Sequence, residues 1–345
     1  MNRKRMVLSL IALGALGGFS SMVPGSVPPP LTLAAAPDTL PPGYLSVLTY
    51  NVGGLPWPVA RDRPQALAAI GDRLAQMRAT GAAPQVVVLQ EAFTTDAEAI
   101  ARRSGYGFVA FGPGAGMAQP ALPGYAPARS IWKGETVGPQ LSSGLVILSD
   151  YRLSDIRRQP FPKGACAGYD CLANKGMLSA RVAVPDAPAP VEIIATHMNS
   201  AGPSGQPEIV SRAAYARQID ALDRFDDRPE SHRTIRLFAG DFNMGHSPGR
   251  LELLMGYIKK RKAKVATAMG RDKYADGCRA MRSLCGAQFA MAANVPAQHA
   301  NDWQFYAAPD MRMLAAVSRE VMFKPDANGK TLSDHLGLKV TYRFQ

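Results

Sequence analysis

The chain has 345 residues, of which 47% are hydrophobic and 19% are charged, so it can build one large core or two modest ones. Its formal net charge is +12; residues 1–36 contribute three basic residues and no acidic ones, which leaves +9 for the remainder. A basic protein is attracted to polyanions, either nucleic acid or an anionic membrane surface, and charge alone does not distinguish these partners.

The first 36 residues have the layout of a secretory signal peptide. Three basic residues lie within positions 1–5, the apolar stretch Met6–Gly18 follows, and a Pro- and Ala-rich segment ends in Ala34-Ala35-Ala36. The apolar stretch is short for a membrane span, although an uncleaved anchor is the alternative. We therefore expect residues 1–36 to be a signal peptide and residues 37–345 to form one domain of a secreted or periplasmic protein.

Short apolar runs alternate with helical patterns along the rest of the chain. Strands are expected at Leu45–Tyr50, Val86–Leu89, Gly144–Leu148, Met177–Val184, Val191–Thr196, Ile235–Ala239, Trp303–Tyr306 and Leu336–Tyr342. Helices are expected at Pro64–Arg78, Ala97–Arg103, Ile209–Phe225 and Pro248–Ile258, the third with Ile209, Ala213, Ala216 and Ile219 on one side. The segment Gly112–Leu141 is rich in Gly, Pro and Ala and is expected to be a long surface loop. Without an interior linker or repeat, the pattern predicts a single layered α/β domain.

The four cysteines lie in two close pairs, Cys166 with Cys171 and Cys278 with Cys285. In an oxidising compartment such pairs indicate short-range disulfides, although four cysteines permit three pairings. A zinc site is disfavoured because the spacings are wrong and no histidine falls inside either pair.

The apolar run Ile235–Ala239 ends in Gly240-Asp241-Phe242-Asn243, which places a carboxylate and a carboxamide two residues apart. Side chains two apart on a strand point to the same face. A carboxylate beside an amide suits a phosphoryl group, because one handles a water or metal while the other donates to oxygen. The alternative is that this strand end only caps the next helix.

Other predicted strands also end in polar residues. These are Asn51, Gln90 with Glu91, His197 with Asn199, Asp302 at the start of a late strand, and Ser333-Asp334-His335 before the last strand. Ligands of open α/β sheets bind beyond the carboxyl ends of strands. Each residue alone is ordinary, but together they provide oxygen ligands for a hard divalent cation, a base and phosphate contacts. The chain lacks a G-x-S-x-G elbow, an H-E-x-x-H motif and a phosphate-binding Gly-rich loop ending in Gly-Lys-Ser/Thr.

Taken in order, these segments resemble the motif series of the endonuclease/exonuclease/phosphatase superfamily. The segments are Thr49-Tyr50-Asn51-Val52, Leu89-Gln90-Glu91-Ala92, Thr196-His197-Met198-Asn199, Gly240-Asp241-Phe242-Asn243, Asp302-Trp303-Gln304-Phe305 and Ser333-Asp334-His335. The resemblance implies a four-layer α/β sandwich, with two packed mixed β-sheets flanked by helices as in DNase I. It also implies magnesium-dependent phosphodiester or phosphomonoester hydrolysis.

The resemblance further implies roles for individual residues. Glu91 and Asn51 would hold Mg²⁺ or another divalent cation such as Mn²⁺. His335 would be the general base that takes a proton from water, and Asp302 would orient it.

Four further residues complete the implied site. Asp241 would position the attacking water, while Asn243 and His197 would bind the phosphoryl oxygens. Asp334 would be either a second-metal ligand or a partner of the site.

The segment Asp170-Cys171-Leu172-Ala173-Asn174-Lys175-Gly176 is similar to the Asp-x(4)-Lys-Gly segment of the neutral, bacterial-type sphingomyelinase C branch. There Lys175 would contact or orient the lipid phosphate, and Asp170 and Asn199 are assigned to the substrate group. The alternative is a tight, disulfide-braced loop with a solvated lysine.

The interval Ala307–Leu332 departs from that branch, whose members commonly carry an aromatic-tipped hairpin there that dips into the membrane. Its only aromatic residue is Phe323, although methionines such as Met311, Met313 and Met322 can contact acyl chains.

We therefore expect an exported, monomeric, Mg²⁺-dependent phosphodiesterase that acts at a phospholipid or sphingolipid surface, cleaving sphingomyelin to ceramide and phosphocholine. The alternative is a secreted Mg²⁺-dependent nuclease with DNA as its substrate, favoured by the charge and by the basic cluster at 259–264. A non-catalytic binding protein is less expected, because every residue of the implied site is present.

Overall fold

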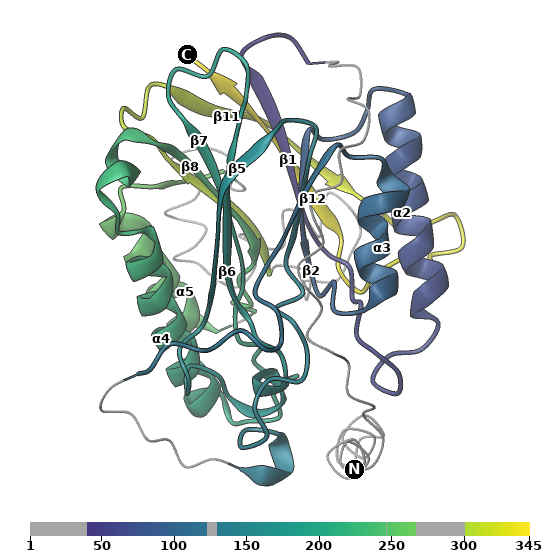
Figure 1. The fold of residues 1–345 in the computed structure, drawn as a ribbon, viewed down its shortest axis with the longest axis vertical. Helices are drawn as coiled ribbons and strands as arrows, with labels where there is room; N and C mark the ends of the chain where they lie inside the picture. The colour runs from purple at the N-terminus through teal and green to yellow at the C-terminus, as the bar shows by residue number, and fades with distance from the viewer. Residues whose placement is uncertain (1–39, 123–129, 246, 267–300) are drawn as a thin grey trace.

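The computed structural model describes residues 40–122, 130–245, 247–266 and 301–345 (Figure 1). The predicted signal peptide and the pair Cys278 and Cys285 lie outside these residues, so those predictions stand untested. No helix in the described ranges is long and apolar enough to cross a membrane.

The first sheet has six strands in the order β11-β12-β1-β2-β4-β3. Its strands are β1 (Tyr44–Asn51), β2 (Val86–Gln90), β3 (Phe108–Phe111), β4 (Val146–Ser149), β11 (Leu314–Met322) and β12 (Gly337–Phe344). Strands β1 and β2 are parallel, and the other neighbours are antiparallel. The carboxyl ends of the two parallel strands therefore meet at one edge of the sheet.

The second sheet also has six strands, in the order β5-β6-β7-β8-β10-β9. They are β5 (Leu153–Pro160), β6 (Gly176–Val182), β7 (Val191–His197), β8 (Ile235–Asp241), β9 (Lys264–Val265) and β10 (Asp302–Ala307). Here β7 and β8 form the parallel pair. Each sheet is thus mixed and has one central pair of parallel strands.

The helices of the described ranges cover the outer faces of the two sheets, as Figure 1 shows. The helices α2 (Arg63–Ala79) and α3 (Thr95–Ser104) lie on the first sheet, and α4 (Glu208–Asp226) and α5 (Pro248–Lys260) lie on the second. Three short 3₁₀ turns complete the described elements: η1 (Ile131–Lys133), η2 (Gly168–Leu172) and η3 (Pro229–Arg233). The predicted four-layer α/β sandwich is confirmed.

Alternating side chains explain why the sheets can be covered on both faces. In β1, Leu45 and Val47 enter the core between the sheets, while Leu48 and Tyr50 pack against the helices α2 and α3. Successive residues of a strand point to opposite faces, so an unbroken apolar run is buried on both sides. The continuous apolar runs in the sequence are therefore explained by strands that are buried on both faces.

All eight predicted strands and all four predicted helices form, with ends that differ by a few residues. Four strands were not predicted: β3, β5, β9 and β11. The strands β3, β5, β9 and β11 lie at the edges of the sheets, where one side lacks a partner strand and the apolar pattern is weaker. The segment Gly112–Leu141 is largely irregular where it is described, as predicted, apart from η1.

The predicted buried face of α4 was wrong. Ile209 is 70% exposed and Ala213 is also exposed, whereas Tyr215, Gln218 and Leu222 are buried. Ile219, the last member of the predicted face, is buried. The apolar side chains Ile209 and Val210 in the first turn of α4 therefore stay exposed, and other positions of the helix form its buried face.

The methionines of the interval Ala307–Leu332 lie against the core of the protein. Met322 is buried, and Met311 and Met313 are partly buried against the core between the sheets. Phe323 stacks on Tyr50 with ring centroids 4.5 Å apart. These side chains stabilise β11 on the sheet and do not form an apolar outer surface.

Candidate active site

Strand register brings three of the predicted site residues into one row. His197 of β7 pairs with Asp241 of β8, and Asp241 pairs on its other side with Asp302 of β10. Directly paired residues project to the same face of a sheet, so the three side chains lie side by side. Asp241 is 1% exposed and stands in the middle of the row.

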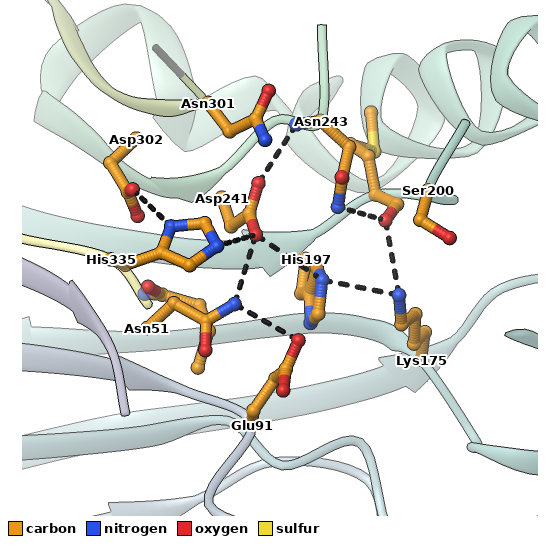
Figure 2. Close-up of polar contacts among 12 residues, drawn as sticks. Asn51, Glu91, Lys175, His197, Ser200, Asp241, Asn243, Asn301, Asp302 and His335 are labelled. Carbon is orange, nitrogen blue, oxygen red and sulfur yellow. Dashed lines mark hydrogen bonds and ion pairs between the residues drawn. The ribbon is translucent and has the colours of Figure 1, made fainter. Parts of the chain in front are cut away.

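The first sheet contributes Asn51 and Glu91, which meet the row from the opposite side (Figure 2). The Asn51 Nδ2 amide donates to Glu91 Oε1 and to Asp241 Oδ2, both at 3.0 Å. Asp241 Oδ2 also lies 3.5 Å from His197 Nε2 and 3.8 Å from His335 Nε2. One carboxylate oxygen therefore connects the two sheets at the centre of the site.

His335 and Asp302 form a short contact, with Nδ1 and Oδ2 2.6 Å apart. Burial favours the neutral imidazole, but the charge of Asp302 and its hydrogen bond raise the pKa of His335 well above its ordinary value. Burial raises the pKa of Asp302 to about 6, although the positive charge of His335 lowers it. The other oxygen of Asp302, Oδ1, is buried and has no hydrogen-bond partner among the described residues.

His197 is buried beside Lys175, which fixes its charge state. Burial, the positive charge of Lys175 and that of His335 lower the pKa of His197 well below its ordinary value, so its imidazole is neutral. Its Nε2 is 3.1 Å from Lys175 Nζ, and its buried Nδ1 has no partner within the described ranges. Asn243 Nδ2 lies close by and donates to the Met198 carbonyl at 3.0 Å.

The Asp170–Lys175 loop reaches the site, as Figure 2 shows for Lys175. Lys175 is buried, and its ammonium donates to Asp170 Oδ1 at 2.5 Å and to the Met198 carbonyl at 3.2 Å. Asp170 Oδ2 accepts from the backbone and hydroxyl of Ser200, both at 2.6 Å. The predicted disulfide between Cys166 and Cys171 is formed and closes this loop.

Two further predicted site residues, Asn199 and Asp334, lie at the margins of this cluster. Asn199 is fully buried: its Oδ1 accepts from the Ala167 backbone and its Nδ2 donates to the Ser200 carbonyl. These bonds hold Asn199 beneath the disulfide loop, and its assignment to the substrate group stays a prediction. Asp334 is exposed at the rim, where its charge raises the pKa of His335.

Sequence reasoning missed two arginines that hold the site loops. Arg63 Nε donates to the Gly53 carbonyl at 2.7 Å, and its Nη2 donates to the carbonyls of Val52 and Leu332. Arg250 is fully buried beneath the loops that follow β7 and β8. A single arginine in a helix gives no sequence signal for contacts with backbone carbonyls of distant loops.

The donor set at Glu91 fits a hard divalent cation. Two carboxylates, Glu91 and Asp241, both accept a hydrogen bond from the amide group of Asn51. No group of three or more His, Cys, Asp or Glu residues in the described chain is arranged to hold a metal. Mg²⁺ is typically held by one or two protein oxygens and keeps its waters, so Glu91 with one amide suffices. Asn51 presents its Nδ2 to Glu91 and Asp241 in the structure, so it would offer its oxygen to a cation beside them only after its amide turns over.

The model of the Endonuclease/Exonuclease/phosphatase family matches residues 48–308, well over half of the chain. The chain belongs to this family. A comparison of the sequence with curated proteins gives no match.

Solved structures share the fold at low sequence identity. Beta toxin from Staphylococcus aureus has a TM-score of 0.56 and 17% identity, with 86% of this chain and 99% of that chain covered. Sphingomyelinase C from Streptomyces griseocarneus has a TM-score of 0.52 and 18% identity, covering 86% and 99% of the two chains. TDP2 from D. rerio, complexed with a single-stranded DNA product, has a TM-score of 0.53 and 17% identity, covering 87% and 99%. Solved structures with this fold therefore include a sphingomyelinase and a protein bound to DNA, so the fold alone does not identify the substrate.

Proposed function

We propose that this protein is an exported, Mg²⁺-dependent phosphodiesterase that hydrolyses sphingomyelin to ceramide and phosphocholine. The observation that carries the proposal is the buried Lys175 ammonium, held by Asp170 and lying 3.1 Å from His197. A solvated surface lysine, which was the alternative, is incompatible with this position. The disulfide between Cys166 and Cys171 supports an oxidising, extracytoplasmic compartment.

The residues present support hydrolysis by an activated water. His335 is oriented by Asp302 through Nδ1, which leaves Nε2 facing Asp241 to take a proton from the water that Asp241 positions. Glu91 and Asn51 would hold the cation, which when bound supplies withdrawal of charge from the phosphorus centre. A solved beta toxin structure of the same fold contains magnesium ions.

The other side of the site supports binding of the phosphoryl group. Asn243 Nδ2 carries two N–H groups and donates one of them to Met198, whereas a neutral His197 that accepts from Lys175 at Nε2 carries its one N–H on the buried Nδ1. The hydrogen bonds of Lys175 to Asp170 and Met198, together with its contact to His197, use its three donors. Lys175 therefore orients the phosphate-binding residues and does not contact the phosphate itself.

Exposed apolar side chains near the Lys175 loop favour a lipid substrate. Trp132 of η1 is 68% exposed, and the neighbouring Lys133 Nζ donates to the Gly205 carbonyl, which brings η1 against the segment before α4. Ile209 at the start of α4 is also exposed, as is Trp57 in the loop after β1. Tryptophan favours the interface between membrane and water, so these residues can supply the contact that the interval Ala307–Leu332 lacks.

The decisive experiment compares sphingomyelin vesicles, phosphatidylcholine vesicles and plasmid DNA with Mg²⁺. We expect phosphocholine release from sphingomyelin, abolished by EDTA and by His335→Ala. Wild-type protein that leaves both lipids intact while degrading DNA would refute the proposal.

A second experiment tests the lipid surface separately from the chemistry. Trp132→Ala should lower hydrolysis of vesicles while leaving hydrolysis of a soluble phosphodiester unchanged. Val317→Ala on β11 is the matched control, because Val317 is also exposed but lies on an edge strand.

A nuclease remains the second candidate, supported by the net charge and by the DNA-bound relative of the same fold. The basic run at the end of α5 supports it less than its sequence suggests. Lys260 pairs with Asp223, and Arg261 pairs with Asp223 and Asp227, so part of its charge is already neutralised. A nuclease should bind DNA with an affinity that falls steeply as salt is raised.

A further inference from the structure

We infer that Arg250 is a positioning residue that sets the geometry of the phosphate-binding half of the site. This inference rests on the proposed phosphodiesterase function, although one of its tests needs no substrate. Arg250 lies in the first turn of α5 and does not belong to any of the sequence motifs described above.

All five N–H donors of the Arg250 guanidinium are used. Nη1 donates to the carbonyls of Asn199 and Asn243, the latter at 3.0 Å. Nη2 donates to the Ser200 carbonyl at 3.3 Å and to Ser211 Oγ at 2.9 Å. Nε donates to Glu208 Oε1 at 3.2 Å, and the guanidinium carbon is 5.0 Å from the centre of the Tyr215 ring.

Three of these acceptors are backbone carbonyls of the two loops that carry site residues. Asn199 and Ser200 follow His197 at the end of β7, and Asn243 follows Asp241 at the end of β8. The guanidinium therefore links the loop of His197 to the loop of Asn243 at a fixed separation. Ser200 is also the residue that binds Asp170, so the link extends to the Lys175 loop.

The conformation of Asn243 makes this link consequential. Asn243 has a φ of 47°, in the left-handed region that non-glycine residues adopt only at a cost in free energy. In that conformation the Asn243 carbonyl accepts a hydrogen bond from Arg250, and the Asn243 side-chain amide donates to the Met198 carbonyl. Loss of the Arg250 bond would free the backbone to relax and would move the amide away from the phosphate position.

A lysine cannot replace this arrangement. The guanidinium is planar and presents five donors in a rigid fork, whereas an ammonium has three donors around one atom. Because Arg250 is fully buried, water cannot easily satisfy the carbonyls that a lysine leaves unpaired. The substitution Arg250→Lys preserves the positive charge but removes the planar set of five donors. It therefore tests the positioning role separately from the charge.

The first test measures Arg250→Lys against the matched control Arg236→Lys. Arg236 is also buried and pairs with Asp226, but it lies near the start of β8, at the end of that strand away from the site. We expect both variants to lose thermal stability, and only Arg250→Lys to lose kcat, by about 100-fold, because a small misplacement of binding groups is costly. KM should change much less. A folded Arg250→Lys protein with kcat within twofold of wild type would overturn the inference.

If Arg250→Lys does not fold, Glu208→Gln provides the second variant. Glu208 is partly exposed and accepts from Nε at the far side of the guanidinium, so its loss should shift Arg250 without removing it. We expect kcat to fall several-fold with little change in stability. An unchanged kcat in this variant would overturn the inference in the same way.

An NMR measurement keeps the inference independent of the substrate. The backbone amide signal of Asn243 and the ring signals of His197 should shift in Arg250→Lys or Glu208→Gln, while the ring signals of His232 in η3 stay fixed. If the wild-type protein cleaves no phosphodiester but these signals shift, the proposed function fails and the positioning role stands. Unshifted His197 and Asn243 signals would refute the positioning role itself.

Discussion

The two sheets contribute differently built halves to one site. On the second sheet, Asp241, His197 and Lys175 are buried and bound to one another or to backbone carbonyls, with Arg250 beneath them. On the first sheet, Glu91 is partly exposed, and among the described residues its carboxylate accepts a side-chain hydrogen bond from Asn51. The half that would bind the phosphoryl group is therefore prearranged by the protein, and the half that would bind the cation leaves a carboxylate with capacity for another partner.

The pKa of Glu91 also distinguishes the half that would bind the cation. Burial raises the pKa of Glu91, although the Asn51 hydrogen bond and the charges of Lys175 and His335 lower it. Glu91 also has a φ of 56°, a conformation that costs free energy in a non-glycine residue. Because burial disfavours the ionised carboxylate of Glu91, a cation bound beside it would stabilise that carboxylate. This is the behaviour expected of a metal ligand.

The largest expected effect separates these halves by substitution. Glu91→Gln and Asp241→Asn should each lower kcat by about 1,000-fold, because both remove charge from the reacting centre. Their stabilities should differ. Glu91→Gln should unfold at or above the wild-type temperature, since it removes a carboxylate that burial disfavours.

Asp241→Asn should instead cost about 2 kcal/mol of unfolding free energy, because its amide NH2 then faces one of the two donors, Asn51 Nδ2 or the Asn243 backbone N–H, that now bind the carboxylate. Calorimetry of the two variants in EDTA measures the contrast. Equal losses of stability would show that the two halves are built alike.

The next effect concerns the contact that joins the halves, His335 with Asp302. The carboxylate of Asp302 raises the pKa of His335, so Asp302→Asn should lower that pKa. The neutral imidazole, which is the form that accepts a proton, would then be populated at lower pH. The acid limb of the kcat/KM profile should move to lower pH as well.

Titration of the His335 ring signals by NMR, in metal-free protein, measures this shift directly. His232, in η3, serves as the internal control and should titrate identically in both proteins. A His335 pKa that is unchanged in Asp302→Asn would remove Asp302 as the orienting partner.

The sequence predicted the shared fold well because the central strands are buried on both faces and read as continuous apolar runs. It also predicted the residues at the strand ends, because β7, β8 and β10 are in register and carry His197, Asp241 and Asp302 to one row. Edge strands such as β5 and β11 escaped prediction, since solvent on one side weakens their pattern.

The supporting residues could not be predicted for a different reason. Arg63 and Arg250 bind backbone carbonyls. Because every residue type supplies a backbone carbonyl, the sequence does not indicate which residues these arginines contact. Gln304 is similar: it is fully buried in β10 and donates across the interface to the Val47 and Leu338 carbonyls of the first sheet. The hydrogen bonds of Asn199 to the Ala167 backbone and the Ser200 carbonyl could not be predicted for the same reason.

A smaller loss of kcat is expected for substitution of Arg63 than for substitution of Arg250. Arg63 binds three carbonyls in the first half but is only half-buried, so water can replace part of what it supplies. Arg63→Lys should therefore lower kcat by about tenfold, less than Arg250→Lys, because the bond to Leu332 steadies the segment before His335.

Arg73→Lys is the control, since Arg73 lies on the same helix and bonds only to Gln76 among the contacts found. Steady-state kinetics on one soluble substrate measure all three variants. A larger loss for Arg63→Lys than for Arg250→Lys would reverse the ranking of the two halves.

The smallest effect lies outside both halves, at Glu135. This buried carboxylate accepts from the backbones of Ser130 and Gly168 and from Gln206 Nε2, each at 2.6 Å, and so ties the segment of Trp132 to the disulfide loop. Glu135→Gln turns one of these contacts into a clash of donors, equivalent to about 1 kcal/mol or about fivefold. If that segment contacts lipid, the fivefold loss should appear on vesicles and not on a soluble phosphodiester. Equal losses on both substrates would mean that Glu135 acts through Asp170 and Lys175, which would make it part of the prearranged half.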